Sequence, residues 1–280
     1  MKKFITFLLM AVISLTACLG LTACNDETES SVVDPRKGNN IVVGYTVYQP
    51  MNYTKDNVLV GFDTELAIMT FEALGYNVTF KAIQWKNKYT ELSQGTIDCI
   101  WNGFTSNGSD KINDVDTPRA QIVDFSYNYM QNAQCILRKD APAITSPSQL
   151  AGKSVAFESG SAGDSLANSY KNSGVNLMPE GLTSQMDAVT KLNNGACDYA
   201  IVDIILAEAI VSQSAYSSLS INTGIDIPVE YYAVGFAKNS ELTAKVNMAF
   251  ELFAQTGYLQ ALADKYNLST SVITDFSSQK

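Results

Sequence analysis

The feature of the sequence that most constrains its fold is a repeated alternation between short apolar runs and segments with helical periodicity. The runs IVVGY at 41–45 and NVTFKAI at 77–83 are typical of strands. Between them, apolar residues recur at helical spacing before Gly75, at Phe62, Leu66, Met69 and Ala73. The same order recurs later, with strands expected at 154–157 and 197–203 and helices near 162–172 and 184–193. This alternation predicts an α/β fold with largely parallel sheets covered by helices.

Two distant segments of the chain resemble each other. LSQGTIDCIWN at 92–102 and LNNGACDYAIVD at 192–203 share the end of a helix, a glycine, an aspartate three residues later and an apolar strand. The identical residues are Leu92, Gly95 and Asp98 in one and Leu192, Gly195 and Asp198 in the other. Three identities can arise by chance, but the shared helix–turn–strand pattern predicts two similar α/β lobes.

The first residues have the pattern of an export signal. Lys2 and Lys3 precede an apolar run at 4–17, which predicts a secretion signal that is absent from the mature protein. Leu-Thr-Ala-Cys then occurs twice, ending at Cys18 and Cys24, and resembles the lipobox of bacterial lipoproteins, in which the cysteine is acylated. We favour Cys24, because the chain remains apolar after Cys18 and becomes polar after Cys24. A secretory peptide with an incidental cysteine, or an uncleaved transmembrane anchor, is the alternative.

The fold is expected to begin near Ile41. Residues 25–40 are polar and contain Pro35 and Gly38, which predicts a flexible tether. The cysteines of the folded part lie in apolar, strand-like runs without the CxxC or His-rich spacing of a metal site, so buried free thiols are expected at Cys99, Cys135 and Cys197.

Composition restricts the class of partner. The 280 residues carry a net charge of -9 and contain no basic stripe that could neutralise phosphates, which argues against nucleic acid. The hydrophobic content of 46% is sufficient for globular cores in a chain long enough for two domains. The absence of histidine excludes His-dependent catalytic triads and most zinc sites. We expect a small-molecule partner and neither a cofactor nor a metal.

The expected strand ends carry groups that are complementary to an amino acid. In open α/β sheets the ligand site lies beyond the carboxyl ends of the strands, which here are Asn-Gly-Phe-Thr at 102–105 and Asp203. On opposite sides of a cleft, Arg119 and the Thr105 hydroxyl can bind a carboxylate, and Asp203 can bind an ammonium group. The segment SGSAGD at 159–164 predicts a helix N-terminus whose backbone N–H groups would add donors.

Five further segments occur in a characteristic order: VGFDTELA at 60–67, DCIWNGFT at 98–105, RAQIVDFS at 119–126, LAGKSVAFESGS at 150–161 and GACDYAIVD at 195–203. They resemble successive landmarks of the family 3 extracellular solute-binding proteins, the receptors of polar amino acid ABC transporters. The resemblance implies a two-lobed Venus flytrap of the periplasmic-binding-protein type II class with two hinge strands. Its expected parts are a signal peptide at 1–24, a tether at 25–40, lobe 1 at 41–130 and 233–280, lobe 2 at 131–232, and hinges near 130–132 and 230–233.

The resemblance further implies how the ligand is bound. Asp203 would bind the α-ammonium group, and Arg119 and Thr105 would bind the carboxylate together with the backbone around Gly103. Donors from lobe 2 would come from Ser161 and Ala162. One departure affects Arg119, because the insertion at 106–118 separates it from the Gly-x-Thr turn. Lys111, inside the insertion, is the alternative donor.

The ligand side chain would lie between the aromatic rings of Tyr48 and Trp85, and Asn102 belongs to the same expected site. A second departure is the loss of an acidic residue that is common in the first strand-loop, where Thr46 or Val47 stands here. Glu158 is the candidate replacement as an anchor for a cationic side chain.

Several of these residues have ordinary structural alternatives. Asp203 can cap the helix expected after it, and Trp85 can be a core residue, as Trp101 is expected to be. A single arginine such as Arg119 is usually a solvated surface charge. Glu158 can lie at the rim of the cleft rather than inside it.

The implied function is that of a lipid-anchored, monomeric receptor on the extracytoplasmic face of the cell membrane, which delivers an amino acid to an ABC transporter permease and is not an enzyme. The alternatives are a cyclohexadienyl-dehydratase-like enzyme, with Glu158 as general acid, and a ligand sensor. The α-ammonium contact implied for Asp203 favours transport or sensing, because the substrates of the dehydratase are carboxylates.

Overall fold

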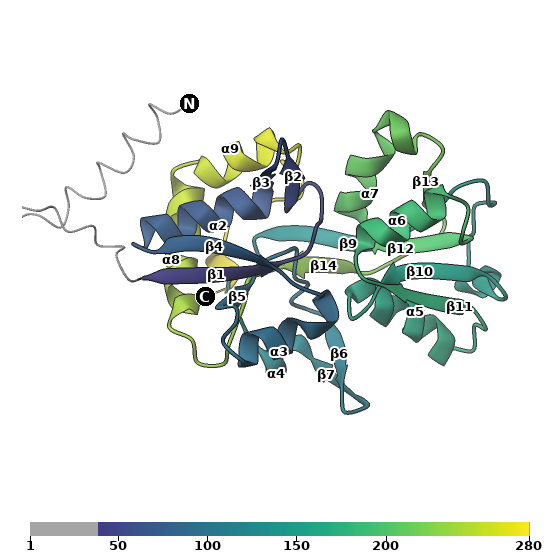
Figure 1. The fold of residues 1–280 in the computed structure, drawn as a ribbon, viewed down its shortest axis with the longest axis horizontal. Coiled ribbons are helices and arrows are strands. Elements are labelled where there is room, and N and C mark those ends of the chain that lie inside the picture. Colours follow the sequence, from purple (N-terminus) through teal and green to yellow (C-terminus); the bar gives the residue numbers. More distant parts are fainter. Residues whose placement is uncertain (1–38, 280) are drawn as a thin grey trace, which may run out of the picture.

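The computed structural model describes residues 39–279 as two lobes, each built around one β-sheet with helices on both faces (Figure 1). The first sheet has the strand order β4 (Asn77–Ala82), β1 (Asn40–Tyr45), β5 (Cys99–Ile100), β15 (Gly235–Phe236), β8 (Asp124–Phe125). Its helices are α2 (Phe62–Ala73), α8 (Leu242–Gln255) and α9 (Tyr258–Lys265) on one face, and α3 (Lys88–Ser93) and α4 (Arg119–Ile122) on the other.

The second sheet has the order β11 (Met178–Leu182), β10 (Ser154–Glu158), β12 (Tyr199–Asp203), β9 (Met130–Arg138), β13 (Ser220–Asn222). One face is covered by α6 (Gln185–Asn193) and α7 (Ile204–Val211), and the other by α5 (Ala162–Asn172). The remaining elements are a hairpin of β2 (Tyr53–Lys55) and β3 (Val58–Val60), and the 3-10 helices η1 (Trp85–Asn87), η2 (Pro147–Leu150), η3 (Ser214–Tyr216) and η4 (Ser277–Gln279). The predicted α/β class is confirmed.

The largely parallel sheets expected from the sequence each contain one strand that runs in the opposite direction. In each sheet three neighbouring strands are parallel, β4-β1-β5 and β11-β10-β12. The next strand, β15 or β9, is antiparallel to them, and the outermost strand, β8 or β13, runs in the same direction as the first three. The antiparallel neighbours are β15 and β9, which belong to the two chain segments that connect the lobes. Their direction is reversed because the chain enters each sheet from the opposite lobe.

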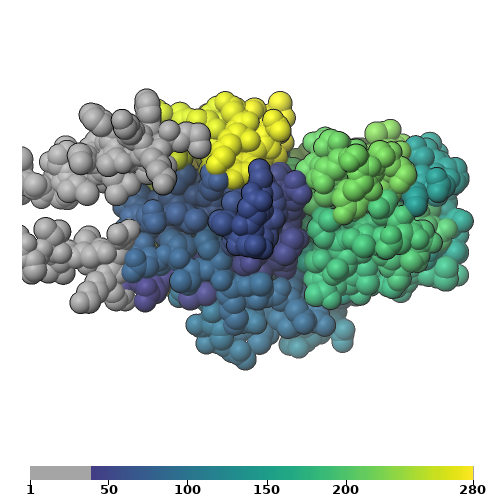
Figure 2. Space-filling view, turned by 45° about the horizontal axis from the view of Figure 1, so that its top comes forward, coloured from purple at the N-terminus to yellow at the C-terminus, as the bar shows by residue number. Residues whose placement is uncertain are grey.

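The two connecting segments pair with each other. β14 (Val229–Tyr232) is antiparallel to the first half of β9, with Tyr232 opposite Met130 and Val229 opposite Ala133. Both strands lie between the lobes in Figure 1, and the lobes are in contact in the space-filling view (Figure 2).

The similarity of the segments at 92–102 and 192–203 is structural. Asp98 accepts a hydrogen bond from the backbone N–H of Val42 at 2.7 Å, and Asp198 accepts one from that of Ser154 at 2.8 Å. Gly95 and Gly195 have φ angles of 67° and 71°, a left-handed conformation that favours glycine at the end of a helix. Each segment therefore ends a helix and attaches its strand to the neighbouring parallel strand, β1 or β10, which confirms the expectation of two similar lobes.

The insertion at 106–118 forms a β-hairpin. β6 (Ser109–Ile112) pairs with β7 (Val115–Pro118), and the two loop residues Asn113 and Asp114 have φ angles of 50° and 65°, as a two-residue hairpin turn requires. Apart from its polar composition, this segment was not expected to form a pair of strands.

The cores agree with the expected assignments. Trp101 is fully buried against Phe71, Tyr129 and Phe250. The cysteines of the described residues are buried and free, as predicted: Cys99, Cys135 and Cys197. The predicted signal peptide, Cys18, Cys24 and most of the tether lie outside the described residues.

Candidate ligand-binding site

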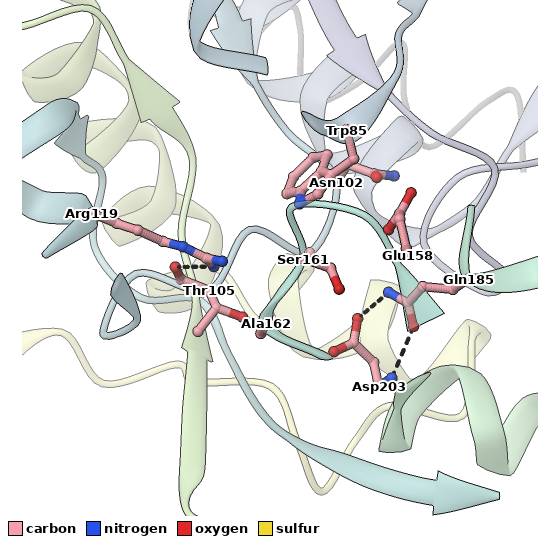
Figure 3. A pocket seen from close by; sticks show the side chains of 10 residues that line it. Trp85, Asn102, Thr105, Arg119, Glu158, Ser161, Ala162, Gln185 and Asp203 are labelled. Carbon is pink, nitrogen blue, oxygen red and sulfur yellow. Dashed lines mark hydrogen bonds between the residues drawn. The ribbon is translucent and has the colours of Figure 1, made fainter. Parts of the chain in front are cut away.

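The carboxyl ends of β5, β10 and β12 meet at a cleft between the lobes. The residues that line it are Trp85, Asn102, Gly103, Thr105, Arg119, Glu158, Ser161, Ala162, Gln185 and Asp203. Figure 3 shows Arg119 and Thr105 on one side, Glu158 and Asp203 on the other, and Ser161 and Ala162 between them. Nine of the ten site residues expected from the sequence are thus brought together, and Gln185 is an addition.

Asp203 is the last residue of β12 and precedes α7. Its carboxylate does not cap that helix. Instead, Oδ2 accepts a hydrogen bond from Gln185 Nε2 at 2.5 Å, and Gln185 Oε1 accepts one from the Asp203 backbone N–H at 2.8 Å. This double contact fixes the carboxylate at the wall of the cleft.

A second carboxylate, Glu230 on β14, shares amide donors with Asp203. Asn132 Nδ2 donates to Asp203 Oδ1 at 2.9 Å and to Glu230 Oε2 at 3.0 Å, and the Gln134 amide also donates to both oxygens. Burial raises the pKa of Asp203, and burial together with the negative charge of Asp203 raises the pKa of Glu230. The two acidic groups thus share amide donors next to the connecting strands, and the charge of Asp203 disfavours that of Glu230.

Glu158, at the end of β10, has one carboxylate oxygen without a hydrogen-bond partner. Its side chain is buried, it lines the cleft, and its Oε1 has no hydrogen-bond partner. Burial, with a further contribution from Asp203, raises its pKa to about 8. A buried polar atom without a partner is rare, so Oε1 is available to a donor on a ligand.

Arg119, at the start of α4, lines the cleft but already has partners. Its Nε and Nη2 donate to Asp110 Oδ1 at 3.1 and 2.8 Å, and its Nη1 donates to the backbone oxygen of Thr105 at 3.0 Å. The guanidinium is buried, so the sequence-based alternative of a solvated surface charge is wrong. Lys111, the other candidate, is exposed on β6.

Lys88 and Asp110 are two charged residues near the cleft whose burial the sequence did not indicate. Lys88 on α3 lies 3.1 Å from Asp110 Oδ2 and donates to the backbone oxygen of Gly160 in the other lobe at 2.9 Å. Burial lowers the pKa of Lys88 to about 8, although Asp110 opposes the shift. Nothing in the run WKNKY distinguishes Lys88 from the exposed Lys86, because the difference depends on which side of a single turn faces the other lobe.

The end of β5 is held by its own network. Asn102 Oδ1 accepts from the Thr46 hydroxyl at 2.7 Å, and Asn102 Nδ2 donates to Asn52 Oδ1 at 2.7 Å. The Gly103 N–H donates to Asp63 Oδ2 at 2.7 Å, so the backbone donor that the resemblance implied for a ligand carboxylate is already engaged. The Thr105 hydroxyl donates to Glu230 Oε2 at 3.1 Å.

The two expected aromatic rings have different positions. Trp85 lines the cleft and packs edge to face against Phe104, with ring centroids 5.3 Å apart. Tyr48 does not line it. Its hydroxyl contacts that of Tyr232 at 2.6 Å, and its ring lies under Gly103, where an added Cβ would be 2.6 Å from Tyr48 Cε1. Tyr48 thus packs against the end of β5 and supports it from outside the cleft.

The N-terminus of α5 faces the cleft. Ser161 is its N-cap and accepts a hydrogen bond from the backbone N–H of Asp164 at 3.2 Å. The first N–H groups of a helix have no partner within the helix and carry partial positive charge, so this end of α5 favours an anion. No cluster of three or more metal-binding side chains occurs within residues 39–279, and none of the helices there is long and apolar enough to cross a membrane.

Comparisons with known proteins give a consistent result. Residues 41–269 match the model of the bacterial extracellular solute-binding proteins, family 3. The chain is 27% identical to the arginine-binding extracellular protein ArtP of Bacillus subtilis, over 95% of this chain and 98% of that protein.

Solved structures of the same type are similar in fold. An ancestral arginine-binding protein bound to arginine has a TM-score of 0.72 and 26% identity, with 81% of this chain and 98% of that chain covered. A substrate-binding protein of an ABC uptake transporter from Streptococcus pneumoniae with bound histidine has a TM-score of 0.71 and 28% identity, with 82% and 93% covered.

Proposed function

The chain belongs to the bacterial extracellular solute-binding proteins of family 3, and from this premise we propose that it binds an α-amino acid between its lobes and delivers it to the permease of an ABC transporter. The observation that carries the proposal is the position of Asp203 and Arg119 on opposite sides of one cleft. Their charges are complementary to the ammonium and carboxylate groups of an α-amino acid.

The contacts of the ligand's ammonium and carboxylate groups are assigned from the hydrogen bonds that Asp203 and Arg119 can still make. Oδ1 of Asp203 already accepts hydrogen bonds from Asn132 and Gln134, so Oδ2, which accepts one from Gln185, would bind the α-ammonium group. The guanidinium of Arg119 has five N–H groups, of which three are used by Asp110 and Thr105. The remaining two, with the N-terminus of α5, would bind the α-carboxylate.

A basic side chain fits the rest of the cleft. Glu158 offers the unpartnered Oε1, and Trp85 offers an aromatic ring on which a cation can stack. Proteins similar to this chain are named for arginine or contain bound arginine or histidine. We therefore expect preference for a cationic amino acid.

Closure of the lobes is part of the proposed function. The cleft is nearly closed, with a cavity volume of only about 10 Å³. An amino acid would therefore enter after the lobes separate. We assign the hinges to 130–132 and 230–233, within and just after the paired strands β9 and β14, with lobe 1 at 41–130 and 233–280 and lobe 2 at 131–232.

The location at the membrane is proposed from the sequence. We propose lipidation of Cys24, which would attach a monomeric receptor to the extracytoplasmic face of the cell membrane near its permease. In cells that express the full chain, Cys24→Ser is expected to prevent processing or release the protein. Mass spectrometry that finds acylation at Cys18, or an unmodified mature N-terminus, would contradict this assignment.

A thermal-shift screen with the standard amino acids and cystine tests ligand binding, because a ligand that binds only the folded state raises the melting temperature. A shift with arginine, lysine or histidine and none with glutamate is expected. If none of the compounds shifts the melting temperature, the proposal of an amino acid ligand fails.

The role of Glu158 has a separate test. A cationic group at Oε1 would lower the pKa of Glu158, so binding of L-arginine at pH 7.5 should release a proton. Calorimetry in two buffers with different ionisation enthalpies measures this release, and Glu158→Gln should remove it. Binding without proton release in the wild type would place the cationic side chain elsewhere.

An enzyme on the same scaffold is the second candidate, favoured by one observation. A carboxyl group with a pKa of about 8 is protonated at neutral pH and can act as a general acid. Prephenate and arogenate are suitable probes. Formation of an aromatic product that depends on Glu158 would favour the enzyme, whereas the receptor leaves both compounds unchanged.

A further inference from the structure

Four side chains form a buried polar cluster behind the wall of the cleft, which we call the Asp110 cluster: Lys88, Tyr89, Asp110 and Arg119. Asp110 Oδ1 accepts from Nε and Nη2 of Arg119 at 3.1 and 2.8 Å. Asp110 Oδ2 accepts from the Tyr89 hydroxyl at 2.6 Å and lies 3.1 Å from Lys88 Nζ. One carboxylate thus contacts two cations and a phenol.

Asp110 compensates charges that would otherwise be costly to bury. The side chains of Arg119 and Lys88 are 1% and 2% exposed, and Asp110 is 11% exposed. Within residues 39–279, no other carboxylate lies within 4.0 Å of either cation. Burial would raise the pKa of Asp110, but Arg119 and Lys88 outweigh it and lower the pKa to about 2. Asp110 is therefore charged at any physiological pH, and both cations depend on it.

The hairpin directs Asp110 toward the cluster. Successive side chains of a strand point to opposite faces, and on β6 Asp110 is turned inward while Lys111 is exposed. The tight turn at Asn113 and Asp114 fixes the register, with Asp110 opposite Thr117 and Lys111 opposite Asp116. Asp116, on β7, is exposed and provides a control with the same chemistry on the same hairpin.

The cluster also lies at the contact between the lobes. Lys88 Nζ donates to the Gly160 backbone oxygen at 2.9 Å, and the Ser165 hydroxyl donates to the Ser109 backbone oxygen at 3.2 Å. Gly160 and Ser165 flank the first turn of α5, whose N-terminus faces the cleft. The hairpin and α3 are thus attached to the lobe that carries Asp203.

We propose that Asp110 is a positioning residue for ligand recognition: it binds the Nε and Nη2 groups of Arg119 and so directs the remaining N–H groups of the guanidinium toward the α-carboxylate of the ligand. The inference rests on the proposed function for its ligand. The position of Arg119 itself does not depend on which ligand is bound. The role of Asp110 and the identity of the ligand can therefore be tested separately.

The first test uses the protein without ligand. The sequence contains three arginines, Arg36, Arg119 and Arg138, so three Nε–H signals are expected in a ¹H–¹⁵N spectrum of the side chains. The Arg119 signal, assigned by its loss in Arg119→Lys, should be shifted and protected from exchange with water. Asp110→Asn should remove this protection, and Asp116→Asn should preserve it. Protection that survives in folded Asp110→Asn would overturn the proposal.

The second test compares two ligands by calorimetry, L-arginine and L-argininamide, which lacks the carboxylate charge. Asp110→Asn should weaken binding of L-arginine about tenfold or more, because a displaced guanidinium no longer meets the carboxylate. Binding of L-argininamide, already weak in the wild type, should change less than threefold, and Asp116→Asn should leave both affinities unchanged. Equal losses for both ligands in Asp110→Asn would show a merely structural role and overturn the proposal.

Two further outcomes remain decisive. If Asp110→Asn does not fold, Asp110→Glu retains the charge and should preserve both the protected signal and the preference for L-arginine over its amide. The proposal is overturned if folded Asp110→Glu loses both the protected signal and this preference while Asp116→Asn keeps the protected signal. If wild type binds neither ligand, the proposal of a basic ligand fails, while the Nε–H signals still decide the role of Asp110.

Discussion

At the scale of single residues, three carboxylates near the cleft differ in the number of their partners. Asp203 and Glu230 each accept hydrogen bonds from side-chain amides, whereas Oε1 of Glu158 has none. Hydrogen bonds to a carboxylate favour its charged form, and burial favours the neutral form. The site thus offers a carboxyl group held in place by amide donors at Asp203 and a group at Glu158 whose charge depends on what binds there.

Replacement of Asp203 tests the assigned ammonium contact. Asp203→Ala should weaken binding of L-arginine by about 2 to 5 kcal/mol, the range for removal of one partner of a buried charge pair. The exposed Asp140 of the same lobe provides the control, since Asp140→Ala should bind as wild type. Calorimetry measures both affinities. An unchanged affinity in folded Asp203→Ala would reduce Asp203 to a structural role.

Glu158 makes stability depend on pH. Its pKa in the folded protein, about 8, lies above the ordinary value of 4.5, so the folded state binds the proton more tightly than the unfolded state. The resulting stabilisation is complete below pH 4.5 and is lost as pH rises through 8. Each pH unit in this window changes the contribution by about 1.4 kcal/mol, which limits it to about 5 kcal/mol.

Glu158→Gln removes this titration while preserving the shape of the side chain. Without ligand, the variant should therefore gain stability relative to wild type between pH 5 and pH 9, by about 2 kcal/mol or more. Guanidinium unfolding at the two pH values measures the free energy of unfolding of both proteins. A difference that is the same at pH 5 and pH 9 would mean that Glu158 is already charged in the folded protein.

At the scale of elements, the end of β5 contributes a rigid support to the site, and the 3-10 turn η1 contributes an aromatic ring. The residues after β5 are bonded to their own surroundings, Asn102 to Thr46 and Asn52 and the Gly103 N–H to Asp63. This strand end is therefore a rigid support whose donors are largely used. Trp85 on η1 instead presents its ring to the cleft.

The two tryptophans test this division. Trp101→Ala leaves a cavity among Phe71, Tyr129 and Phe250 and should lower the free energy of unfolding by about 3 to 5 kcal/mol. Trp85→Ala should reduce the affinity for L-arginine more than it reduces stability. Thermal melting and calorimetry on both variants check the prediction. The reverse pattern would exchange the roles of the two residues.

At the scale of the whole molecule, the lobes meet closely at Gly160. This residue has a φ angle of 75°, its backbone oxygen accepts the hydrogen bond from Lys88, and an added Cβ would lie 3.0 Å from the backbone Cα of Lys86 in the other lobe. Glycine allows this approach because it has no Cβ. Closure around a ligand thus depends on a contact of backbone with backbone.

Gly160→Ala should therefore oppose closure. Gly174, at the end of α5, has a similar φ angle of 91° but nothing within 4 Å of an added Cβ. Both alanine variants carry similar backbone strain, about 1 kcal/mol or more. Only Gly160→Ala should lose affinity for L-arginine and show a larger radius of gyration in small-angle X-ray scattering with ligand. Equal behaviour of the two variants would exclude Gly160 from closure.

Local pattern determined much of this protein by itself. The alternation of strands and helices, the matching turns at Gly95 and Gly195, and the polar strand end at 102–105 all depend on residues close together in the chain, so the sequence predicts them. Segments such as 60–67 and 195–203, which occur in the order typical of the family, were also sufficient to predict the family. Since ligands bind beyond strand ends in such folds, Asp203 could be expected at the cleft.

Only the tertiary structure decided which of these groups remain available to a ligand and which are already bonded within the protein. The partners of Arg119, Gly103 and Tyr48 come from a hairpin, a helix and a connecting strand, and no local pattern specifies such contacts. Lys88 and Asp110 resemble surface charges in the sequence, and they are buried because two segments fold against each other at the edge of the other lobe. Burial and charge pairing arise where these segments meet, because they depend on distances across the fold rather than on neighbours along the chain.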